Sequence, residues 1–196
     1  MTDVLVVAEV SEGQPRKATL SAISFAKAVA EGTGGAFDIL SIGDGAESAA
    51  GALTGFGARK VLHTEIGGGY VSETFAPTVA AAADGYGVVT ACASSFGKDL
   101  LPRVASKLDA GVASDISSVA VEGGDILYTR PMYAGNVFGT LKITTPVQVV
   151  TVRQSEFEPA AESGGASPVE AFGAVDGGDA AGRIEVVNLE AVKSER

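Results

Sequence analysis

Short, mostly apolar segments recur in the first half of the chain, at residues 4–8, 37–42, 60–63 and 87–92. The first is an uninterrupted apolar run, which is typical of a strand buried on both faces of a parallel sheet. Segments with helical spacing or small residues follow each of the four, at 16–31, 46–54, 72–83 and 98–108. Four strand–helix pairs within about 110 residues predict a parallel sheet with helices on both faces.

Prolines and serines indicate where two of these helices begin. Ser72 is a plausible N-cap, but Pro77 would also fit the first helical position if the helix began at Ala76. Pro102 likewise places the start of the fourth helix near residues 100–101.

The pattern changes after Gly111. Residues 123–125 (Gly-Gly-Asp) predict a tight hairpin, so part of the second half should pair antiparallel. The expected strands there cover residues 116–122, 125–130, 137–144 and 147–152. The predicted fold is therefore a three-layer αβα domain over residues 1–153, with a mostly parallel, Rossmann-like sheet and an antiparallel C-terminal part.

The rest of the chain has a different composition. Residues 154–182 are rich in Ala, Gly, Ser and acidic residues, which predicts a mobile loop or linker. Residues 183–189 have the pattern of one last strand, so residues 183–196 are expected to hold a terminal strand and the start of a connection to a further domain.

Composition excludes several classes of function. A net charge of −10 argues against nucleic-acid binding, which needs clustered Lys and Arg. A single cysteine (Cys92) and a single histidine (His63) exclude an internal disulfide and the multi-cysteine or two-histidine metal sites. No signal-like leader and no apolar stretch of about 20 residues is found, which predicts a soluble, cytoplasmic protein without membrane insertion.

The run from Ser94 to Lys98 is the best candidate for a ligand site. It joins the carboxyl end of the fourth strand to the next helix, a place where open α/β sheets gather ligands and where helix N–H groups favour anions. Ser95 could cap the helix, Gly97 permits close backbone approach and Lys98 supplies positive charge. The alternative is a simple helix cap that contacts another domain. Gly43-Asp44-Gly45 lacks the third glycine of a dinucleotide fingerprint.

The run from Arg130 to Asn136 interrupts a strand pattern. Gly135 and Asn136 tolerate positive φ, and the run should form a bulge or crossover that places Tyr133 at an interface. Tyr133 and Tyr128 could stack on a flavin or adenine, although packing against a partner protein is the commoner use of Tyr. No nucleophile–base pair is evident, and three further acidic residues match no metal loop: Asp99, Asp109 and Asp115.

In order and spacing, these motifs resemble the N-terminal domain of electron transfer flavoprotein alpha subunits. The resemblance runs through residues 4–9, 57–62, 93–103, 113–116, 130–136 and 152–153 and the Ser-Gly-Gly linker. It implies a nucleotide alpha-hydrolase-like fold and a heterodimer with a beta subunit. In the whole protein, FAD carries electrons from acyl-CoA and other dehydrogenases to a quinone oxidoreductase.

The family's flavin is held mainly by a domain that follows this one, so we expect no FAD-binding residue in this chain. The leading hypothesis is a non-catalytic scaffold and subunit-interface domain. Its candidate interface or anion-binding residues are Ser95, Gly97, Lys98, Arg103, Arg130, Tyr133 and Asn136. The second hypothesis is a free-standing adenine-nucleotide-binding module of stress-protein-like fold, which would use residues 94–98 for phosphate. An enzyme ranks last.

Overall fold

A computed structural model describes residues 1–188 and 190 of the chain. Its central sheet is built of parallel strands in the order β11-β4-β3-β1-β5-β10-β6. The strands are β1 (Val4–Ser11), β3 (Phe37–Ile42), β4 (Val61–Thr64), β5 (Val88–Cys92), β6 (Gly111–Ile116), β10 (Gln148–Val152) and β11 (Val169–Ala171). The short β2 (Gln14–Pro15) pairs antiparallel with the end of β1.

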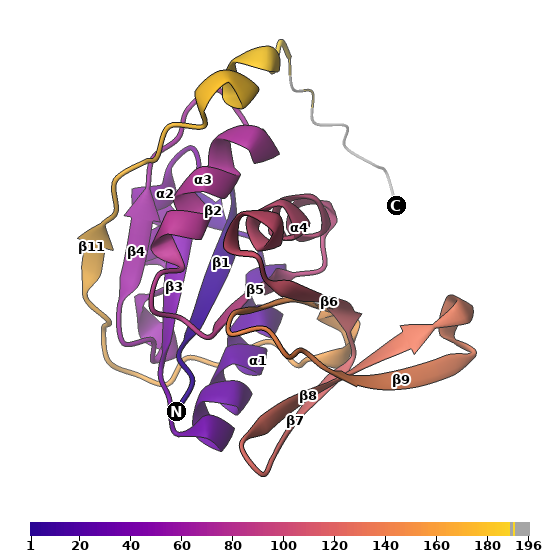
Figure 1. Cartoon of the computed structure of the whole chain (residues 1–196). Coiled ribbons are helices and arrows are strands. Elements are labelled where there is room, and N and C mark those ends of the chain that lie inside the picture. Colours follow the sequence, from indigo (N-terminus) through magenta and orange to yellow (C-terminus); the bar gives the residue numbers. More distant parts are fainter. Residues whose placement is uncertain (189, 191–196) are drawn as a thin grey trace.

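Helices cover both faces of this sheet (Figure 1). The helices α1 (Ala18–Thr33) and α2 (Ala46–Gly51) pack on one face, and α3 (Ser72–Ala82) and α4 (Ser95–Leu108) pack on the other. Four short 3₁₀ turns complete the described helices: η1 (Thr54–Phe56), η2 (Tyr133–Gly135), η3 (Gln154–Glu156) and η4 (Gly178–Arg183). The predicted three-layer αβα fold is confirmed.

The two-residue repeat of a strand divides the core between these layers. In β1, Val4, Val6 and Ala8 face α1, whereas Leu5 and Val7 face α3 and α4. All five side chains are buried. An apolar run without alternation is therefore what a central strand requires when both of its faces are covered.

A second, antiparallel sheet projects from the side of the domain as an arm (Figure 1). It consists of β7 (Ser118–Glu122), β8 (Asp125–Met132) and β9 (Val137–Lys142), in that order. Gly123 and Gly124 both have positive φ and form the β7–β8 turn, so the predicted hairpin is correct. Strand β6, which the sequence pattern missed, lies at the edge of the parallel sheet, where only some of its side chains are buried.

Both proline-based helix starts are wrong. Helix α3 begins at Ser72 with Val71 as its N-cap, and Pro77 lies inside it. Helix α4 begins at Ser95, so Pro102 also lies within the helix. Each proline removes one backbone donor from its helix, and packing of both helices against the sheet overrides that cost.

The segment expected to be a mobile loop or linker runs as a strap along the domain. Ala160 N–H donates to the Leu20 carbonyl of α1 (3.1 Å), and β11 extends the parallel sheet beyond β4. The last expected strand is also wrong, because residues 184–188 lie outside any strand. Residues 189 and 191–196 of that prediction lie outside the described part of the chain.

Candidate functional site

The order in which strands are added reverses between β1 and β5. The strands β3 and β4 lie on one side of β1, and the chain then returns to form β5 on the other side. Ligands of open α/β folds collect at such a switch point. Here the Ser94 hydroxyl donates to the Glu9 carboxylate (Oγ to Oε2, 2.7 Å), which also pairs with Arg16 (Oε1 to Nε, 3.3 Å). The chain's own side chains therefore bridge this crevice.

The amino end of α4 is built for packing. Ser94, rather than Ser95, is the N-cap, and its Oγ accepts the Gly97 N–H at 3.3 Å. Ser95 itself is exposed. A Cβ at Gly97 would lie only 2.0 Å from the carbonyl oxygen of Cys92, so glycine is needed for helix–strand contact. The predicted close approach at Gly97 is thus an approach to the protein's own backbone.

Lys98 joins an ion-pair cluster instead of standing free. Its Nζ lies 3.5 Å from Asp115 Oδ2, and Arg153 Nη2 lies 2.7 Å from the same oxygen. The hydrogen bond from Arg153 and the charge of Lys98 lower the pKa of Asp115, which therefore stays ionised. Asp115 sits with φ of 58° beside the irregular β6–β10 register. The cluster ties α4 to the two strands at this edge.

A second carboxylate occupies the start of α2. The backbone N–H groups of Gly45 and Glu47 donate to Glu65 (2.9 and 2.8 Å). These are the donors that an anion would otherwise use at a glycine turn of this kind. Sequence reasoning missed Glu9 and Glu65 in these roles. Their position within two residues of the end of a predicted strand is the only available signal.

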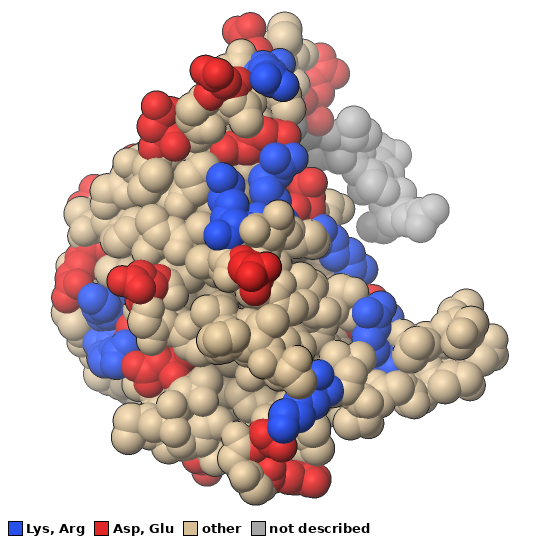
Figure 2. All heavy atoms as spheres, in the orientation of Figure 1, with Lys and Arg blue, Asp and Glu red and all other residues tan. Residues whose placement is uncertain are grey.

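The arm carries several exposed apolar side chains around the candidate residue Tyr133. Side chains of Tyr133 and Phe138 are 77% and 64% exposed, and Met132 and Val137 are also exposed. Figure 2 shows the end of the arm without Lys, Arg, Asp or Glu. The run from Arg130 to Asn136 is thus the end of β8 and a hairpin turn, not a bulge or crossover.

The turn's backbone matches expectation at Gly135 and differs at its neighbours. Tyr133, Ala134 and Gly135 have positive φ, whereas Asn136 has φ of −71°. The Asn136 amide instead donates to the Tyr133 carbonyl (2.8 Å) and fastens the turn. Tyr133 is left at the tip, outside the domain body.

The remaining candidates lie elsewhere. Tyr128 is fully buried, and its hydroxyl donates to Gln148 (2.6 Å), so it presents no exposed ring face for stacking. Arg103 pairs with Glu73 of α3 (2.7 Å). The seven predicted residues are therefore split between the start of α4, the α3–α4 face and the arm.

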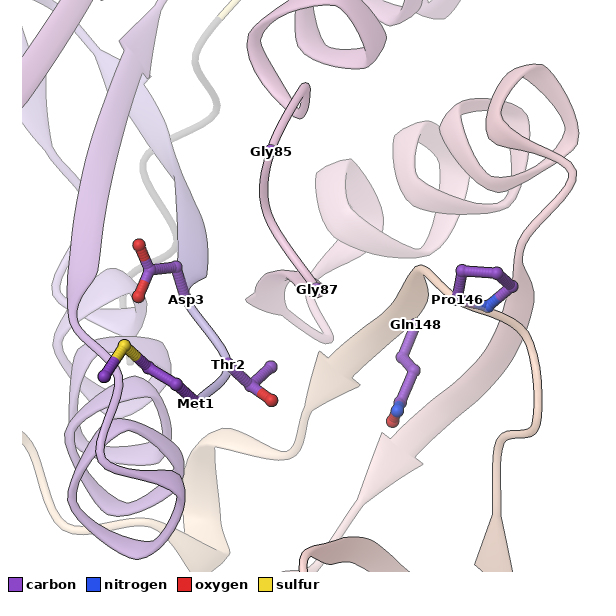
Figure 3. A pocket seen from close by; sticks show the side chains of 7 residues that line it. All are labelled: Met1, Thr2, Asp3, Gly85, Gly87, Pro146 and Gln148. Carbon is purple, nitrogen blue, oxygen red and sulfur yellow. The ribbon is translucent and has the colours of Figure 1, made fainter.

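The amino ends of β1, β5 and β10 surround an open hollow of about 370 Å³ (Figure 3). Thr2, Asp3, Gly87 and Gln148 are among the residues that line it. Asp3 also pairs with Arg59 (2.8 Å), so this carboxylate is committed to a structural contact.

Arg59 also binds Asp38, a fully buried carboxylate on β3, at 2.6 Å. The hydroxyl of Tyr86 and the backbone N–H of Lys60 donate to the same side chain. Burial and the contact with Asp38 raise the pKa of Tyr86, which therefore stays protonated. This cluster fixes the loops at the amino edge.

Other chemistry is not evident within residues 1–188 and 190. The described residues contain no group of three His, Cys, Asp or Glu side chains that could hold a metal ion. Cys92 is buried, and burial raises the pKa of its thiol. In the same part of the chain, no helix combines the length and apolar character needed to cross a membrane.

Comparison with known proteins matches this architecture to one family. The family model of the electron transfer flavoprotein domain matches residues 4–176. The electron transfer flavoprotein subunit alpha of Pseudomonas aeruginosa is 36% identical over 197 residues, covering 98% of this chain and 60% of the relative. The subunit alpha of Bacillus subtilis is 31% identical over 168 residues (79% and 48%), and that of Paracoccus denitrificans is 34% identical over 179 residues (89% and 56%).

The chain thus spans about half to three-fifths of the length of these curated relatives. The resemblance inferred from the motifs is confirmed. The chain belongs to the electron transfer flavoprotein family and corresponds to the N-terminal domain of its alpha subunits.

Proposed function

We propose that this domain is a scaffold that binds the beta subunit of an electron transfer flavoprotein through its projecting arm. The observation that carries the proposal is the arm's uncovered apolar end, from Arg130 to Phe138. A monomeric domain gains nothing from holding such side chains in water, and apolar projections of this kind mark protein interfaces.

The arm's inner face continues the core outward. Tyr128, Arg130 and Met132 alternate along one face of β8, opposite Leu141, Gly139 and Val137 of β9. Tyr128 is buried in the domain, Arg130 is half-buried, and Met132 is exposed. A partner seated beyond the body would therefore complete the hydrophobic layer that begins at Tyr128.

Arg130 adds a charge to this surface. Its Nε is buried without a hydrogen-bond partner, and within the described residues it forms no ion pair. A buried guanidinium nitrogen is costly unless a carboxylate or other acceptor meets it. We expect the beta subunit to supply that acceptor, with Tyr133 and Asn136 beside it. Lys98 is a further candidate contact, although its charge is paired with Asp115 within this chain.

Two places at the carboxyl edge of the sheet argue against FAD binding by this domain. Glu9 bridges the switch-point crevice and Glu65 takes the α2 donors, so neither place can accept a pyrophosphate without removing a carboxylate. The same contacts argue against the adenine-nucleotide module. We therefore propose that the flavin, and the transfer of electrons from dehydrogenases to a quinone oxidoreductase, belong to the complete heterodimer. On this proposal, the domain has no catalytic site of its own.

Calorimetric titration of the purified chain separates the two functions. The scaffold proposal predicts no saturable heat with FAD or with ADP. Heat that saturates near one equivalent of FAD would place part of the flavin site in this domain. Saturation by ADP alone would favour the nucleotide-binding module instead.

A further inference from the structure

The strap is held to the domain by hydrogen bonds along its whole course up to Val175. Ser24 and Lys27 of α1 bind its carbonyls (2.7 Å to Glu158 O and 3.4 Å to Ala161 O). Further on, Thr64 donates to the Phe172 carbonyl (2.8 Å), and Val175 N–H donates to Thr78 of α3 (2.9 Å). These contacts and the β11–β4 pairing fasten the strap as part of the fold.

The chain is held differently after Gly177. The Gly177 backbone lies against the Glu73 carbonyl, since a Cβ added there would come within 2.8 Å of that oxygen. Pro77, four residues after Glu73, cannot donate to this carbonyl. From there to residue 188, the described contacts include no hydrogen bond that joins the segment to the body of the domain. What remains is apolar contact.

The turn η4 packs against α3, and beyond it two apolar side chains provide the contact. Ile184 and Val186 line a hollow of about 340 Å³ between this segment and the α3–α4 face. Val186 also approaches the loop before α3, because a Cβ at Gly69 would lie 3.2 Å from it. Val187, the next residue, is 88% exposed and points away.

Aromatic and charged side chains line the floor of this hollow. Tyr70 packs against Phe75 and Phe96, with ring centroids 5.1 and 4.9 Å away, and its hydroxyl donates to Asp99 (2.7 Å). The Glu73–Arg103 ion pair lines the same space. One aromatic edge, two carboxylates and a guanidinium thus share one groove.

We infer that residues 184–187 are a detachable lid over the groove formed by Tyr70, Glu73, Asp99 and Arg103. The lid opens at the Gly177–Gly178 junction while the strap before it stays in place. Segments held by few apolar contacts open at much lower free energy than the hydrogen-bonded core. Tyr70 is 36% exposed with the segment in place, and opening uncovers more of it and of the Glu73–Arg103 pair on the α3–α4 face.

Residue-resolved acetylation of tyrosines by N-acetylimidazole, read by mass spectrometry, tests the lid on the full chain. The double variant Ile184→Ser/Val186→Ser should raise the labelling rate of Tyr70 at least threefold. Val187→Ser is the matched control, and it should leave the rate unchanged. Tyr133 and Tyr128 give the fully exposed and fully buried rates within each sample.

Trypsin cleavage after Arg183 should accelerate in the same double variant and not in the control. Equal Tyr70 labelling in the double variant and in Val187→Ser would overturn the lid. So would a parallel rise at Tyr128, because the segment would then be part of the cooperative fold. Neither result depends on whether the arm binds a beta subunit.

Discussion

The hydroxyl of Ser94 and the carboxylate of Glu9 lie 2.7 Å apart and join β5 to β1 across the switch point of the sheet. In this class of fold that crevice is the usual ligand site. The chain fills it with its own hydrogen bond and places Glu65 on the donors of α2. The chain's own carboxylates thus occupy hydrogen-bonding positions at the carboxyl edge of the sheet, where ligands of this fold usually bind. Exposed apolar side chains lie instead at the end of the arm.

Replacing Gly97 by alanine should destabilise the domain by about 2–4 kcal/mol, because the new Cβ would overlap the Cys92 carbonyl and force the helix away from the strand. Urea unfolding measures the effect. Gly51→Ala is the matched control at another helical glycine, where a Cβ meets nothing within 4 Å. That control should be neutral or slightly stabilising. A Gly97→Ala variant as stable as the parent would refute the packing role.

Asp115→Asn should cost about 1–2 kcal/mol of stability at pH 7, because it removes the charge that Arg153 and Lys98 share. Asn tolerates the left-handed backbone of this position, so the change isolates the charge. The pKa of Asp115 is lower in the folded protein than its ordinary value of 3.8. Its stabilisation is therefore complete above that value and is lost as the pH falls through the folded pKa.

Unfolding free energies measured from pH 7 down to pH 3 should thus converge for Asp115→Asn and the parent. The control Asp125→Asn breaks an exposed pair with Lys142 and should change stability little at any pH. A difference between parent and Asp115→Asn that stays constant across this range would contradict the electrostatic account.

Glu65→Ala should cost about 1 kcal/mol, because it leaves the Gly45 and Glu47 N–H groups without their acceptor. Glu65→Gln keeps one carbonyl oxygen and should fall between the alanine variant and the parent. Thermal unfolding of the three proteins gives the order. If the glutamine variant were less stable than the alanine variant, Glu65 would not act as a cap.

Asp38→Ala should destabilise by about 1–3 kcal/mol, because it leaves the Tyr86 hydroxyl and the Lys60 N–H without their buried acceptor, whereas Arg59 keeps its pair with Asp3. Tyr86→Phe removes one hydrogen bond to the same carboxylate and should cost about 1 kcal/mol. Tyr133→Phe is the control at an exposed tyrosine. Equal stability of Tyr86→Phe and Tyr133→Phe in urea would show that the buried hydroxyl contributes nothing.

The central strands were predictable from the sequence because burial on two faces leaves a continuous apolar run, as in β1 and β5. The edges were not. Strand β6 mixes Ser114 and Asp115 with buried Ala113 and Ile116, so its pattern is that of an irregular segment. Strand β11 pairs with the open side of β4 where the strap passes it. This pairing depends on the tertiary structure and not on a local sequence pattern.

The candidate site was likewise predictable only where a local pattern of residue types determines it. Residue type indicated irregular backbone between Arg130 and Asn136, and the structure places a hairpin turn there at the end of the arm. It did not indicate that Tyr128, two residues before Arg130, turns into the core, because strand alternation could not be assigned a buried side in advance. The Lys98–Asp115 pair joins residues 17 positions apart in sequence through packing of α4 on β6.

The affinity of the chain for an electron transfer flavoprotein beta subunit tests the central claim most directly. We predict that Arg130→Gln/Tyr133→Ser raises the dissociation constant at least tenfold, since Arg and Tyr dominate interface energetics. The control Lys107→Gln/Val187→Ser, which changes one exposed cation and one exposed apolar residue away from the arm, should leave it unchanged. Equal affinity of the parent and the arm variant would contradict the assignment of the arm as the subunit interface.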